Sequence, residues 1–196
     1  GPVFRFPLTL RQFLTLGFFM GGFNVLYTFA VLWSNPITIS AISVAMPLTG
    51  AIVARAMLGA RLEPGFGLAL LLTIGGGALV VYGQPGFDAS ALGLRGGEVL
   101  MLVAMFSWNI FSLKAQQWLG HLGQARLTLI SSISTCLWLG AVMASMLALG
   151  VARWPAQTPP MDAFAMVFYL ALFSAAVGNM LWNYGVSVLG LPISSL

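Results

Sequence analysis

Two asparagine residues, Asn24 and Asn179, lie in apolar stretches near opposite ends of the chain. Each is followed three residues later by a large aromatic side chain, Tyr27 in the first stretch and Trp182 in the second. Residues three apart lie on one face of a helix, so each amide shares a face with its aromatic partner. Such a pair can hydrogen-bond the polar end of a small molecule and pack against its body.

The two stretches also resemble each other over a longer range. With Asn24 set beside Asn179, further matches pair Leu26 with Leu181, Phe29 with Tyr184 and Val31 with Val186, and one inserted residue brings Pro36 beside Pro192. The chain is therefore built as two halves of one pattern. We place the boundary between the halves at residues 88 and 89, so that 1–88 and 89–196 each form part of one repeat.

The composition indicates a membrane protein. Hydrophobic residues make up 59% of the chain and charged residues 6%, and the mean hydropathy is +0.96. A chain with so few polar residues cannot cover a soluble globule and must face lipid. The net charge of +4 does not indicate a nucleic-acid partner, because the basic residues are scattered singly. We expect an all-α integral membrane protein, a polytopic helical bundle in a lipid bilayer.

About 20 apolar residues are needed to cross a bilayer as a helix. By that measure the sequence predicts six spans and the start of a seventh in its last residues. The spans cover about 10–33, 36–58, 66–83, 96–119, 127–150 and 162–189. The links between them are short, so neighbouring spans should pack antiparallel.

The basic residues predict the orientation of these spans. One side of the zigzag would carry Arg5, Arg11, Arg55, Arg61, Lys114 and Arg126, and the other would carry Arg95 and Arg153. Positively charged links stay in the cytoplasm, so the first group should be cytoplasmic. The first span then runs outward and the sixth inward. Repeats of opposite orientation are the architecture of secondary transporters, which bind their substrates near the midplane.

Other polar and aromatic residues lie near the middle of predicted spans. Pro47 removes a backbone donor and leaves the carbonyl of Ser43 without its usual helical partner. Trp108 is far from a span end, and Ser112 follows it on the same face. Helix packing and interhelical hydrogen bonds are the alternative roles for all of these side chains. The candidate substrate-binding residues are thus Asn24, Tyr27, Ser43, Pro47, Trp108, Ser112, Asn179 and Trp182.

Few ionisable side chains accompany these candidates. Glu98 lies in the first turn of a predicted helix, where a carboxylate either stabilises the helix N-terminus or couples transport to protons. Cys136 should be a small buried hydrophobic residue, and His121 has no second ligand at metal-binding spacing. We expect no metal, no cofactor and no catalytic constellation, and therefore not an enzyme.

Three segments carry a resemblance to a known family. Ala41–Gly83 contains a proline-bearing helix, a Leu-Gly-x-Arg-Leu motif and a glycine-rich helix, Gly97–Leu100 leads to Trp108, and Tyr169–Ser195 forms the last apolar segment. This combination resembles the EamA-type transporters of the drug/metabolite transporter superfamily. Ala60 stands where the family usually has an acid, which puts an ion pair or gate at that position in doubt, although Glu63 is nearby.

The resemblance implies ten helices in two inverted five-helix repeats, in a bacterial inner membrane with both termini cytoplasmic. It also implies export of amino acids or other small metabolites by a monomer or homodimer. Against that pattern the chain matches helices three to eight and the start of the ninth, as a piece of a longer protein would. A non-transporting scaffold subunit and a channel-like pore are the alternatives.

Overall fold

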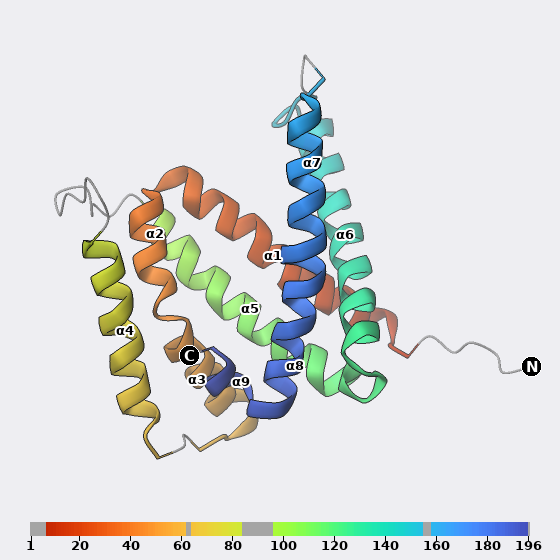
Figure 1. Cartoon of the computed structure of the whole chain (residues 1–196). Coiled ribbons are helices and arrows are strands. Elements are labelled where there is room, and N and C mark those ends of the chain that lie inside the picture. The colour runs from red at the N-terminus through yellow and green to blue at the C-terminus, as the bar shows by residue number, and fades with distance from the viewer. Residues whose placement is uncertain (1–6, 62–63, 84–95, 155–157, 196) are drawn as a thin grey trace, which may run out of the picture.

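The structure is a computed structural model that describes residues 7–61, 64–83, 96–154 and 158–195, and all its regular elements in these ranges are helices (Figure 1). They are α1 (Leu10–Trp33), α2 (Pro36–Ser43), α3 (Met46–Leu58), α4 (Phe66–Tyr82), α5 (Gly97–Leu119), the short 3-10 turn η2 (Gly120–Leu122), α6 (Gln124–Ala148), α7 (Met161–Tyr169), the π-helical η3 (Leu170–Gly178), α8 (Asn179–Leu189) and α9 (Leu191–Ser194). The all-α prediction is confirmed for these residues. The predicted boundary at residues 88 and 89 lies outside them.

Four continuous helical segments of the described chain are long and apolar enough to cross a membrane. They are α1, α5 with η2, α6, and the run from α7 through η3 to α8. The pair α2 and α3 adds a fifth span if its bend is counted as one crossing. At 17 residues, α4 is about 25 Å long and falls short of a standard crossing. The six-span count thus remains a prediction, although every predicted span corresponds to a helix, to the pair α2 and α3, or to the continuous run α7–η3–α8.

The bend between α2 and α3 follows from a proline. The two axes differ by 46° across a break at Val44 and Ala45. Pro47 lies in the first turn of α3, where its missing N–H costs no hydrogen bond. In the middle of a continuous helix it would remove a hydrogen bond and clash with the preceding turn. The chain therefore restarts its helix just before Pro47, and α2 and α3 meet at a kink.

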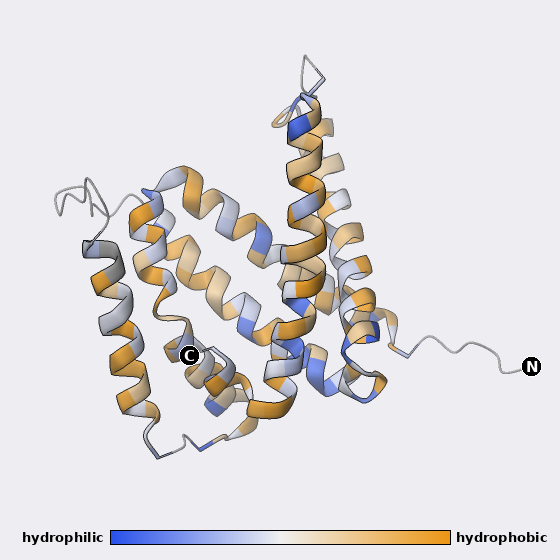
Figure 2. Ribbon diagram, viewed as in Figure 1, coloured by the Kyte–Doolittle hydropathy of each residue, from blue (hydrophilic) through white to orange (hydrophobic). Residues whose placement is uncertain are grey.

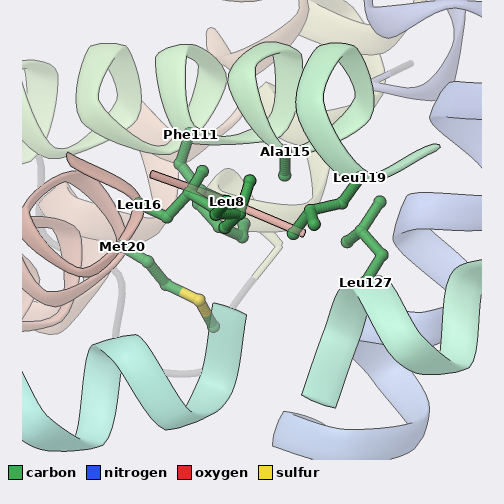
Figure 3. Close-up of a cluster of buried hydrophobic side chains, with 7 residues drawn as sticks. All are labelled: Leu8, Leu16, Met20, Phe111, Ala115, Leu119 and Leu127. Atoms are coloured by element: carbon green, nitrogen blue, oxygen red, sulfur yellow. The ribbon is translucent and has the colours of Figure 1, made fainter. Parts of the chain in front are cut away.

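A buried cluster joins three of the long helices. It contains Leu8, Leu16, Met20, Phe111, Ala115, Leu119 and Leu127, which come from α1 and the residues before it, from α5 and from α6 (Figure 3). α1 packs along both α5 and α6. The cluster lies beside the first half of α1, so the three helices are closely packed there.

Two glycines of α1 let α6 approach closely. A Cβ atom on Gly17 would lie 2.5 Å from the Ser134 Oγ, and one on Gly21 would lie 2.7 Å from the Trp138 ring. The Ser134 hydroxyl donates a hydrogen bond to the Phe13 carbonyl of α1. Small residues permit such close packing between helices in membranes. The four-residue spacing of Gly17 and Gly21 places both on the face of α1 that contacts α6.

Connections between helices lie at two ends of the bundle. In Figure 1 the α1–α2 junction and the end of α6 lie toward the upper edge, and the α5–α6 and α8–α9 junctions lie lower. Large apolar side chains face outward along this bundle, and only 6% of an apolar 18-residue stretch within Met161–Leu189 is buried. Figure 2 shows hydrophobic residues along α4 and the α7–α8 run. An apolar surface of this extent marks a lipid- or protein-facing exterior.

Candidate functional site

A cavity of about 460 Å³ lies where α1, α5, α6 and the η3–α8 run meet. Its lining residues are Met20, Phe23, Asn24, Trp108, Ser132, Thr135, Cys136, Leu139, Ser174, Ala175, Gly178, Asn179 and Trp182. The two repeated stretches therefore border one space. The size is within the range of small-molecule sites.

Asn24 reaches the cavity from the second half of α1. Its Nδ2 donates to the Met20 carbonyl at 2.8 Å, and the Thr28 hydroxyl donates to the Asn24 carbonyl at 2.8 Å. These bonds stay within α1 and leave the amide oxygen of Asn24 able to accept from a ligand. The close contacts at Gly17 and Gly21, one turn or two earlier, set the distance between this part of α1 and α6.

Asn179 reaches the same cavity from the first residue of α8. It directly follows the nine-residue π-helical η3. π-Helical segments are rare in proteins, and those that occur are often found at functional sites. The Asn179 side chain is 9% exposed, and among the described residues its amide has no hydrogen-bond partner. An amide without a protein partner at a cavity wall is available to a bound molecule.

Aromatic rings line the cavity between the two amides. The Trp108 and Trp182 ring centroids are 5.8 Å apart, and Phe23 lies 4.9 Å from Trp108. The Trp182 Nε1–H donates to the Ser112 Oγ at 2.9 Å. Ser112 is fully buried and does not line the cavity, so its contribution is to hold the Trp182 ring in place.

Besides Ser112, three of the predicted binding residues do not line this cavity. Tyr27 is 42% exposed and stacks on Phe23, with 5.8 Å between centroids. Pro47 is buried at the start of α3. Ser43 ends α2, and its hydroxyl donates to the Ile39 carbonyl at 2.8 Å.

Glu98 also lies outside the cavity. It is 4% exposed in the first turn of α5, where its Oε2 accepts the Gly96 N–H at 2.8 Å. Its other oxygen accepts a hydrogen bond from the hydroxyl of Ser34, the C-cap residue that directly follows α1. This geometry joins the end of α1 to the start of α5 and matches the helix-terminus role weighed for Glu98.

The sequence interpretation missed the contribution of α6. Ser132, Thr135, Cys136 and Leu139 all line the cavity, and their spacing places them on one helix face. None of these residues was among the candidate binding residues, and the prediction that Cys136 is buried is wrong, because Cys136 is exposed. The signal that could have found this face was the i, i+3, i+4 spacing of the small residues Ser132, Thr135 and Cys136.

The cavity lining carries no Asp, Glu, Lys, Arg or His among the residues described. No group of three or more His, Cys, Asp or Glu side chains that could hold a metal ion occurs in the described part of the chain. The chemistry available at this site is hydrogen bonding by amides and hydroxyls, together with aromatic and aliphatic packing.

Among proteins of known sequence, the chain is similar to the uncharacterized transporter YyaM of Bacillus subtilis strain 168, with 22% identity over 176 residues. The match covers 89% of this chain and 56% of the relative, so the chain spans about half the length of the curated relative it matches. No family model matches the sequence, and no solved structure gives a significant match.

Proposed function

We propose that this chain forms part of a secondary transporter for small molecules. The observation that carries the proposal is that Asn24 and Asn179, from the two related stretches, line one cavity together with Trp108 and Trp182. A solute-sized cavity bounded by polar groups, inside a bundle whose exterior is apolar, is what a membrane carrier requires.

Similarity to a protein named as a transporter supports this general function. We further propose, from the EamA-type resemblance, two inverted repeats in the bacterial inner membrane that export amino acids or related metabolites. In this proposal Arg11, Arg55, Arg61, Lys114 and Arg126 face the cytoplasm, and Arg5 lies outside the described residues.

Alternating access would need a binding site, a pivot between tightly packed helices and a flexible hinge. The amides of Asn24 and Asn179 would bind the polar part of the substrate, and the two tryptophan rings would pack on its body. The contact of α1 with α6 at Gly17 would serve as the pivot, and the 46° bend at Pro47 as a hinge. Rocking of one repeat against the other then exposes the cavity to each side in turn.

Counterflow tests this proposal. The full-length protein is reconstituted in proteoliposomes loaded with a metabolite mixture, and uptake of labelled members of the mixture is followed. Trp182→Ala should abolish counterflow without lowering yield, because it removes a wall of the cavity. Trp182→Phe keeps an aromatic ring but loses part of the volume and the indole N–H, so it should retain a reduced flux. Trp154→Ala is the matched control, because Trp154 is 74% exposed and does not line the cavity.

Unchanged counterflow in Trp182→Ala would remove this cavity from the transport path. Uptake that rises linearly with substrate concentration would indicate a pore in place of a carrier. No counterflow for any metabolite class would favour a scaffold subunit.

A further inference from the structure

The cavity contains several polar groups that the protein itself does not satisfy. Asn179 is 9% exposed, and within the described ranges its amide makes no hydrogen bond. Ser132, which is half-buried, and Ser174, which is exposed, line the same cavity, and their hydroxyls also make no hydrogen bond there. A buried amide such as that of Asn179 is nearly always paired in folded proteins. A ligand with hydrogen-bond donors and acceptors would therefore satisfy groups that are otherwise left to water.

The same lining offers nothing to balance a charge. No residue that lines the cavity in the described part of the chain is an acid or a base. An ion moved into such a site loses its hydration without gaining an opposite charge, which is costly. The part of the ligand that enters the cavity should thus be polar and uncharged.

A second chamber of about 460 Å³, lined by α1 and α6, lies next to the first. Asn24 and Leu139 line both chambers. The rest of the second lining is almost entirely apolar: Val25, Phe29, Leu32, Val142, Met143 and Met146. Its other polar member, Thr28, already donates its hydroxyl to the Asn24 carbonyl at 2.8 Å. Methionine side chains adapt readily to different apolar shapes.

We propose that the ligand of this site is an uncharged amphiphile. Its amide or hydroxyl head binds Asn179 and the neighbouring hydroxyls, and its apolar tail passes Leu139 into the second chamber. The inference rests on the proposed transport function, because a transported substrate must enter this cavity. It narrows the substrate class to metabolites with an uncharged head group. Free zwitterionic amino acids are disfavoured because neither of their charges finds a partner.

Cys136 provides a readout that does not depend on transport. It lines the first chamber and is exposed, so a bound ligand should shield it from a membrane-impermeant maleimide. Four probes share one isobutyl side chain and differ in head charge: N-acetylleucinamide is neutral, leucine zwitterionic, leucinamide cationic and N-acetylleucine anionic. The alkylation rate is measured on the purified full-length protein with each probe, and Cys136→Ser gives the blank.

N-acetylleucinamide should protect Cys136 at concentrations about tenfold lower than the charged probes, the difference expected for one uncompensated polar interaction. Equal protection by leucine, or protection by none of the probes, overturns the inference. Protection by the neutral probe without counterflow would leave the inference standing and remove the transport function. Counterflow of leucine without preferential protection by the neutral probe would support the transport function and overturn the inference of an uncharged ligand.

Variants test the two chambers separately. Asn179→Ala should weaken protection by N-acetylleucinamide about tenfold, through loss of head-group hydrogen bonds, and Asn179→Gln should restore part of it. Val142→Trp fills the second chamber and should weaken the protection of Cys136 by N-acetylleucinamide. Protection by N-acetylglycinamide, which has no side chain, should be unchanged. Leu137→Trp is the control on α6, because Leu137 is 62% exposed and lines neither chamber. Equal effects of Val142→Trp and Leu137→Trp would overturn the role of the second chamber.

Discussion

Trp182 on α8 donates its indole N–H to the hydroxyl of Ser112 on α5 at 2.9 Å, and this bond fixes one wall of the cavity. The Ser112 hydroxyl donates in turn to the Trp108 carbonyl at 2.9 Å. A serine that lies outside the cavity therefore orders an aromatic ring that lies on its wall. The effect of changing Ser112 should consequently reach the ligand through Trp182.

Ser112→Ala should lower the free energy of unfolding by about 1 kcal/mol, because the indole N–H loses its acceptor in a water-poor site. It should also weaken ligand protection of Cys136, since the Trp182 ring is no longer held. Thermal unfolding in detergent and the alkylation assay measure the two effects. Ser145→Ala is the control, because Ser145 is exposed and bonds only within α6. Identical behaviour of the two variants would contradict the positioning role of Ser112.

Gly17→Ala should destabilise the bundle by about 1–3 kcal/mol, the usual cost of adding atoms to a packed contact. The new Cβ would lie 2.5 Å from the Ser134 Oγ and 2.6 Å from the Ser134 carbonyl oxygen, so α1 and α6 must separate. Gly140→Ala is the matched control on α6, where a Cβ meets nothing within 4 Å. Thermal unfolding of both variants in detergent compares them, and equal stability would show that the contact can relax.

Asn183 and Thr128 should be energetically coupled. The Asn183 Nδ2 donates to the Thr128 Oγ1 at 3.2 Å, and Asn183 is 1% exposed. Asn183→Leu and Thr128→Val each leave one buried partner unsatisfied, whereas the double variant removes both. A double-mutant cycle on unfolding free energies should therefore give a coupling of about 0.5–1.5 kcal/mol. Strictly additive losses would show that this bond contributes nothing to the α6–α8 contact.

Glu98→Gln should affect stability and leave ligand binding intact. The carboxylate accepts from Ser34 and from the Gly96 N–H, and charge-assisted bonds of this kind contribute about 1–3 kcal/mol. Glu98 does not line the cavity, so protection of Cys136 by ligand should match the unmodified protein. Uptake driven by a pH gradient should also persist. Loss of gradient-driven uptake with normal counterflow would instead assign Glu98 to proton coupling.

The sequence by itself determined where the helices lie. Apolar runs of about 20 residues, interrupted by Asn35-Pro36, Pro47 and short polar links, place α1 over the predicted first span and α5 within one residue of the fourth. These features are local, because hydropathy, capping and the missing N–H of proline act within a few residues of themselves. The pairing of Asn24 with Asn179 was also visible, as an internal repeat.

Only the tertiary structure decided which polar residues share a space. Ser112 and Trp108 are on one helix, yet Trp108 lines the cavity while Ser112 is buried behind Trp182. Tyr27 follows Asn24 by three residues but turns outward onto Phe23. The face of α6 that carries Cys136 joins the site because Gly17 and Gly21 bring α6 against α1. Helix rotation and separation depend on contacts between residues distant in the chain, and no local pattern specifies them.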